Sequence, residues 1–166
     1  MKTFKILLII IFSAVTLILT GQEVPDKKAE KKEKIAAAVK DAVETVNIKI
    51  VIDKIITKSR STIEANNEYE IIIKNDSLTC YLPYFGESYT APLFPADVRV
   101  EFEEKKITFS KCSPRQGIYL IKFNTKADIG LETFSFTITI FESGFCIVNL
   151  TPSKRDYIIY HGTLKY

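Results

Sequence analysis

The chain of 166 residues contains 23 lysines and arginines and 20 aspartates and glutamates, so its formal net charge at pH 7 is +3. Removal of residues 1–21, which contain Lys2 and Lys5 but no acid, lowers this charge to +1. Such a balance excludes the pronounced basic face of a nucleic-acid-binding protein, and the roughly 145 remaining residues suit one domain with a proper core.

The first 21 residues have the pattern of a signal peptide. Residues 1–5 are short and basic, and residues 6–19 are apolar except for Ser13 and Thr16. This run is shorter than the roughly 20 residues that span a membrane, and it is typical of a secretory signal. We therefore expect export to the periplasm or beyond, with cleavage near Thr20 or Gly21 and no lipid anchor, because no cysteine follows the run. An uncleaved membrane anchor is the alternative.

Residues 22–34 are dense in charge and predict a solvated linker that continues into a helix. A basic arm near a membrane surface is the alternative reading of this segment. The apolar positions that follow lie on one stripe of a helix: Ile35, Val39, Ala42, Val43 and Val46. We predict one amphipathic helix from about Pro25 or Asp26 to Val46, which packs on a sheet or a barrel end.

After Asn47 the apolar period changes from 3.6 to 2, which indicates β-strands. A polar stretch at residues 58–68 predicts a long loop. Short turns join about nine strands into an antiparallel meander: 48–52, 69–73, 78–82, 98–102, 107–111, 118–124, 131–141, 145–150 and 157–164. Because an open sheet of this size would expose long edges, the fold class is mainly β, a lipocalin-like barrel with a two-layer β-sandwich as the alternative. Residues 35–166 form the single domain.

The segment 83–95 is rich in both proline and aromatic residues. Pro83, Pro92 and Pro95 exclude a central strand because proline fixes φ and lacks a backbone donor. The segment and the strand before it also carry five rings: Tyr81, Tyr84, Phe85, Tyr89 and Phe94. One interpretation is a loop whose rings plug one end of the core. The other is an aromatic recognition surface, which makes these five residues the candidate ligand-binding residues.

The pattern L-P-Y-F-G-x-x-Y-x-A-P is formed here by Leu82, Pro83, Tyr84, Phe85, Gly86, Tyr89, Ala91 and Pro92. It resembles the bacterial family known as domain of unknown function 4251, and the likeness covers roughly residues 25–166. The resemblance implies a secreted or envelope protein of Gram-negative bacteria with an antiparallel β architecture. It implies no activity.

Residue types that carry catalysis are scarce. His161 is the single histidine, no G-x-S-x-G or C-x-x-C motif occurs, and no glycine-rich phosphate loop is present. We therefore expect no enzymatic activity, no catalytic or metal-binding residues and no cofactor. The cluster of Glu101, Glu103 and Glu104 could form a carboxylate pair, but its strand pattern predicts a solvated face.

The three cysteines allow several arrangements. Cys80 and Cys146 alternate with apolar residues and should face inward, either as free thiols or as a disulfide with each other. Cys112 lies at a strand end and could join another chain.

The sequence predicts a non-catalytic secreted or periplasmic binding module that uses the segment 83–95 and the barrel mouth. Its partner would be a small apolar ligand, a glycan or a peptide, with no nucleic acid, and with a membrane only through an uncleaved signal segment. The alternatives are a carboxylate-based hydrolase of glycans or esters and a purely structural envelope protein. A cavity lined by Tyr119, Phe134 and Phe136 would favour ligand binding, whereas two facing carboxylates in a cleft would favour hydrolysis.

Overall fold

The computed structural model describes residues 27–66, 68–87, 99–128 and 131–166. The chain divides into two compact units, residues 1–31 and 32–166, and the second contains all the strands that are described. The predicted signal peptide, residues 1–21, lies outside the described residues. In the ranges given above, no helix is both long and apolar enough to cross a membrane. The elements are α2 (Lys27–Glu44), β1 (Asn47–Ile56), β2 (Thr62–Glu64), β3 (Glu70–Lys74), β4 (Ser77–Pro83), β5 (Arg99–Lys106), β6 (Phe109–Arg115), β7 (Ile118–Lys126), β8 (Thr133–Phe141), β9 (Phe145–Pro152) and β10 (Ile158–Lys165).

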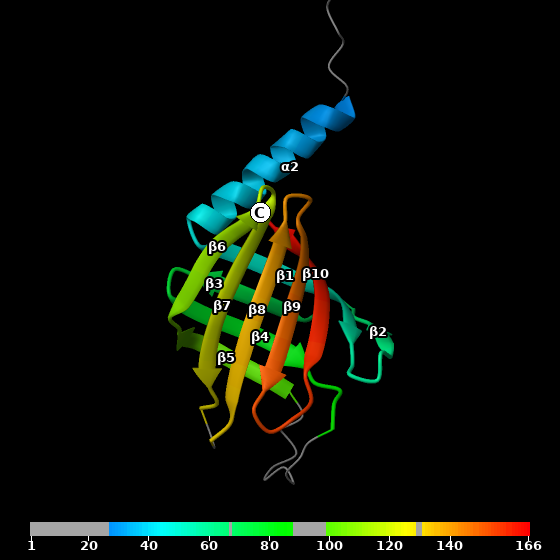
Figure 1. Ribbon diagram of the computed structural model, residues 1–166, viewed down its shortest axis with the longest axis vertical. Coiled ribbons are helices and arrows are strands. Elements are labelled where there is room, and N and C mark those ends of the chain that lie inside the picture. The colour runs from blue at the N-terminus through cyan, green and yellow to red at the C-terminus, as the bar shows by residue number, and fades with distance from the viewer. Residues whose placement is uncertain (1–26, 67, 88–98, 129–130) are drawn as a thin grey trace, which may run out of the picture. The chain divides into compact units, whose positions relative to one another are not determined.

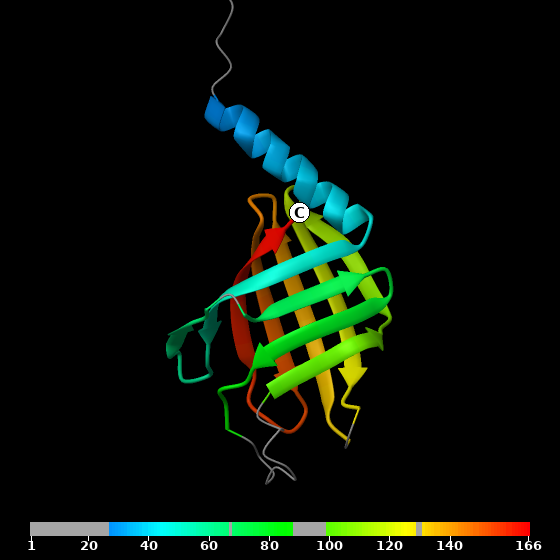
Figure 2. The same cartoon turned by 180° about the vertical axis from the view of Figure 1, so that it is seen from behind.

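Nine strands form one antiparallel sheet in the order β5-β4-β3-β1-β10-β9-β8-β7-β6, and β2 pairs with β1 beside this path. The sheet curls so that β3, β4 and β5 cross behind β7, β8 and β9 (Figure 1), as the view from behind confirms (Figure 2). The predicted mainly-β class is therefore confirmed in the form of a curled half-barrel with a helix before it. Successive strands of this path are neighbours except β5 and β6, and β1 pairs with the last strand, β10, as in a meander that closes into a barrel.

The core lies between the two layers of the curled sheet. Inward positions alternate along each strand, so that Ile50 and Ile52 of β1 are fully buried. Phe102 of β5 meets Phe134 of β8 edge to face, with ring centroids 5.5 Å apart, and thereby joins the two layers. Phe136 stacks on Phe123 at 4.7 Å. Phe134 and Phe136, predicted as possible cavity walls, thus pack against other rings.

Helix α2 follows the predicted stripe closely. Val39, Ala42 and Val43 are its buried residues. The helix ends at Glu44, and Val46 has a φ of 51°, a left-handed conformation that redirects the chain into β1. Lys111 of β6 donates from Nζ to the carbonyl oxygen of Val43 at 2.8 Å. The positive charge of Lys111 at the C-terminal end of α2 also complements the helix dipole.

The predicted loop at residues 58–68 contains the short strand β2. This strand pairs with the far half of β1, where Lys54 and Glu64 form an exposed ion pair at 3.0 Å. The pairing follows from a register irregularity in β1 between Ile52 and Lys54, which turns the end of the strand away from β3. Three residues with little apolar pattern gave no strand signal in the sequence.

The predicted turn at residues 103–106 is instead the end of β5. Glu104, with a φ of 46°, marks an irregularity in its pairing with β4, and the strand continues to Lys106. The chain then passes through residues 107–108 to β6, at the opposite end of the sheet order. Ile107 is buried, and its backbone N–H donates to the carbonyl of Asp76 at 2.8 Å. Residues 107–108 thus connect the two layers of the curled sheet, where a hairpin between neighbouring strands was expected.

All three cysteines lie in the described residues and carry free thiols, so Cys80 and Cys146 are not bridged. Burial raises the pKa of the Cys80 and Cys146 thiols from 9.0 to about 12, whereas the side chain of Cys112 is exposed. We therefore expect a thiol reagent at about pH 8 to label Cys112 alone in the folded protein and all three cysteines in urea. Mass spectrometry of the labelled peptides checks this, and rapid labelling of Cys80 or Cys146 in the folded state would contradict it.

Candidate ligand-binding site

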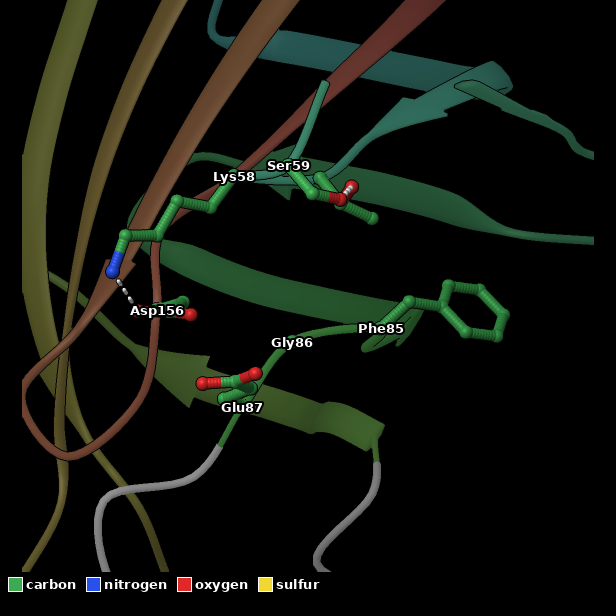
Figure 3. Close-up of a pocket in the computed structure, with 7 residues that line it drawn as sticks. Lys58, Ser59, Phe85, Gly86, Glu87 and Asp156 are labelled. Carbon is green, nitrogen blue, oxygen red and sulfur yellow. Dashed lines mark hydrogen bonds and ion pairs between the residues drawn. The ribbon is translucent and has the colours of Figure 1, made fainter. Parts of the chain in front are cut away.

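A pocket of about 570 Å³ lies where three distant segments of the chain meet. Residues 57–59 after β1, residues 85–87 after β4, and Asp156 in the connection between β9 and β10 line it (Figure 3). Its volume falls within the range of small-molecule sites. Of the lining residues that the structure describes, one carries an aromatic ring, and most of the others carry a hydroxyl or a charge.

A tight turn after β1 supplies the first wall. The backbone N–H of Arg60 donates to the carbonyl of Thr57 at 2.9 Å, and Arg60 has a φ of 64°. The hydroxyl oxygens of Thr57 and Ser59 are 2.9 Å apart, and the hydroxyl of Ser61 is 3.3 Å from that of Ser59. Thr57 and Ser59 of this row line the pocket.

Tyr84 anchors the second wall. Its ring is buried, and its hydroxyl donates to the backbone carbonyl of Asp156 at 2.7 Å. The backbone N–H of Asp156 in turn donates to the carbonyl of Glu87 at 3.1 Å. The hydroxyl of Tyr160 donates to the carbonyl of Pro83 at 2.9 Å, and burial raises the pKa of Tyr160, so that this donor stays protonated. The segment is therefore fixed to the β9–β10 side of the sheet both before and after Phe85.

Gly86 is required by this anchoring. A Cβ atom built at position 86 would collide with the hydroxyl end of the Tyr84 side chain. Tyr84 itself cannot move aside without losing its hydrogen bond to Asp156. The glycine of the aromatic segment therefore lets the chain fold closely over a buried tyrosine.

One ion pair lines the pocket, and a second lies beside the Tyr84 ring. Lys58 Nζ lies 2.7 Å from Oδ1 of Asp156, whose side chain is 7% exposed. Arg155 Nε lies 3.1 Å from both carboxylate oxygens of Glu132, and Nη2 lies 2.6 Å from Oε2. The Arg155 guanidinium also lies 5.1 Å from the centre of the Tyr84 ring. Each buried charge thus meets an opposite charge, as buried ions require.

The five candidate residues occupy different places. Tyr84 belongs to the core, and Phe85, 46% exposed, lines the pocket. Tyr81 lies on the outer face of β4, where it stacks on Tyr69 at 5.7 Å with the guanidinium of Arg99 5.5 Å from its ring centre. Tyr89 and Phe94 lie outside the described residues, as does most of the segment 83–95. The structure therefore brings one of the three described candidates directly to the pocket.

Sequence reasoning missed Lys58, Ser59 and Asp156, because no motif connects them and they meet only after folding. The Arg155–Glu132 pair was missed for the same reason. The one available signal was weak: Arg155 and Asp156 are adjacent charges between two strongly apolar strands.

The residues considered for catalysis lie elsewhere. Glu101, Glu103 and Glu104 are exposed on β5, which confirms the predicted solvated face. His161 is half-buried on β10 and meets the ring of Phe145 edge to face at 5.3 Å. Within the part of the chain that is described, no three His, Cys, Asp or Glu side chains are grouped so that they could hold a metal ion.

Comparison with known proteins gives a family and a fold. The family model described as a domain of unknown function, DUF4251, matches residues 30–164. The crystal structure of a DUF4251 family protein from Bacteroides eggerthii DSM 20697 is similar, with a TM-score of 0.60 and 10% sequence identity, and the match covers 79% of this chain and 87% of that chain. At this identity the likeness shows the fold alone. No curated protein matches the sequence.

Proposed function

Because the chain belongs to the DUF4251 family, whose description names no activity, we propose a function from the site itself. The protein is an exported, non-catalytic binding module that holds a polar ligand in the pocket between residues 57–59 and residues 85–87. Export is proposed from the basic start and apolar run of residues 1–21.

The observation that carries this proposal is the fixed geometry of the pocket. Phe85 and Glu87 are held between the Tyr84 hydroxyl bond to Asp156 and the Asp156 N–H bond to Glu87. Because these residues are already fixed, binding of a ligand costs little conformational entropy at this wall. Binding sites for small ligands are usually preformed in this way.

The lining favours a polar ligand over an apolar one. Among the described residues that line the pocket, Phe85 supplies the only ring, and the others are mostly hydroxyls and charged groups. An apolar ligand would leave these groups without their water and without new partners, which is costly. Inside the half-barrel, Phe134 packs against Phe102 and Phe136 packs against Phe123.

One observation favours the alternative of a hydrolase: Glu87 and Asp156 both line the pocket. A glycosidase needs one carboxyl group that stays protonated in an apolar environment. Here Asp156 is ion-paired with Lys58, and Glu87 is exposed at the pocket edge. Binding without turnover therefore remains the better-supported function.

A pocket-filling variant tests the proposal. We expect polar fragments that raise the melting temperature of the wild type to bind at least about tenfold more weakly to Ser59→Trp. The matched control is Ser135→Trp, on the exposed outer face of β8, which should bind them as the wild type does. Equal binding by Ser59→Trp and the wild type would contradict the proposal. Chemical conversion of a bound fragment would instead support the hydrolase.

A further inference from the structure

We infer that the ligand is a glycan chain, with one sugar in the pocket and neighbouring sugars along the exposed rings of Phe85 and Tyr81. This inference rests on the proposed function, since it names the class of molecule that the same pocket takes. It is argued from the hydrogen-bonding groups of the pocket, its charge and the path of the rings.

The hydrogen-bonding groups of the pocket match hydroxyls. The hydroxyls of Thr57 and Ser59 share one hydrogen bond at 2.9 Å, and a hydroxyl can accept a second bond as well as donate one. The carboxylate of Glu87, for which the described part of the chain shows no ion-pair or hydrogen-bond partner, only accepts. A sugar carries adjacent hydroxyls that donate to carboxylates and accept from hydroxyls, so it satisfies both kinds of group at once.

The charge of the pocket disfavours anions. Lys58, the one cation among the described lining residues, already lies 2.7 Å from Asp156, and Glu87 adds a further negative charge. A carboxylate or phosphate ligand would therefore meet net repulsion. A neutral ligand avoids this penalty. A small organic cation also would, and the experiment below separates the two.

Rings extend the site beyond the pocket. Leu82 and Tyr84 point into the core, so Tyr81 and Phe85 lie on the outward side of the same stretch of chain. Figure 3 shows the Phe85 ring directed away from Lys58 and Asp156, towards the outside of the pocket. Four residues of extended chain span at most about 14 Å, a distance that a few linked sugars can cover.

Tyr81 is held in a fixed orientation beside the pocket segment. It stacks on Tyr69 with 26° between the ring planes, and Arg99 donates to its hydroxyl at 3.1 Å. The ring remains 37% exposed, and that of Phe85 46% exposed. The exposed ring of Phe85 can pack against the C–H face of a sugar, while the hydroxyl of Tyr81 and the guanidinium of Arg99, which lies over the Tyr81 ring, supply polar contacts beside it. A small organic cation could contact one of these rings through its face, but it would be too short to span the pocket and both rings.

Ligand-observed NMR with neutral tetrasaccharides of glucose, xylose, mannose and N-acetylglucosamine tests the inference. We expect at least one tetrasaccharide to bind more tightly than its monosaccharide. Phe85→Ala and Tyr81→Ala should each weaken that binding by roughly threefold to tenfold, the usual contribution of one ring contact. Phe145→Ala, which removes a ring of similar exposure at the start of β9, should leave it unchanged.

The outcomes separate this inference from the proposed function. Binding of n-butylammonium, but of no tetrasaccharide up to about 10 mM, would overturn the glycan and leave the pocket as a binding site. Tetrasaccharide binding that is insensitive to both ring variants would also overturn it. If fragments bind equally to the wild type and to Ser59→Trp, the proposed function itself fails.

Discussion

Replacing Arg155 with methionine is expected to lower the free energy of unfolding by about 3–5 kcal/mol. The Arg155 and Glu132 side chains are 10% and 11% exposed, and the guanidinium binds both carboxylate oxygens. Methionine fills a similar volume but leaves the Glu132 carboxylate buried without its cation. It also removes the guanidinium from the rings of Tyr84 and Phe134. Urea unfolding of wild type and variant measures the loss.

Two further variants separate the ion pair from other causes. Glu64→Gln breaks the exposed pair with Lys54 and should cost less than about 1 kcal/mol. The double variant Arg155→Met, Glu132→Met buries no charge and should recover most of the stability lost by Arg155→Met alone. An Arg155→Met variant within about 1 kcal/mol of the wild type would show that this pair does not brace the site.

The local pattern of the sequence predicted most of the elements. The alternation in β8 places Phe134 and Phe136 inward, and the structure buries both. The stripe of α2 likewise identified Val39 and Val43 as core residues. Burial alternates every second residue in a strand and about every 3.6 in a helix, so these faces can be read without knowing what they pack against.

The pairing of distant strands could not be predicted in this way. β1 pairs with β10, and the local residue pattern of neither strand identifies its partner. Gly162 of β10 shows the physical reason for the fit, because a Cβ atom there would collide with the carbonyl group of Val51 on β1. An isolated glycine in a strand indicates a close backbone approach, but it does not say which backbone approaches.

The candidate site was predictable only in part. The aromatic segment was identified by its composition, and the alternation of Cys80 with apolar residues predicted the inward side of the strand before it, which the structure buries. Lys58 and Asp156 reach the pocket through the β1–β2 turn and the β9–β10 connection, and the conformation of such connections depends on the assembled sheet. The sequence therefore indicated which segment to study and not what it would meet.

Unfolding of Tyr84→Ala and Phe85→Ala, measured side by side in urea, tests most directly whether one residue anchors this segment and the next faces a ligand. Tyr84→Ala should lose about 3–5 kcal/mol, because it empties a buried site and removes the bond to the Asp156 carbonyl. Tyr84→Phe, which loses the hydroxyl alone, should lose about 1 kcal/mol. Phe85→Ala should stay within about 1 kcal/mol of the wild type while ligand binding weakens. Equal losses at both positions, or a larger loss at Phe85, would contradict the account.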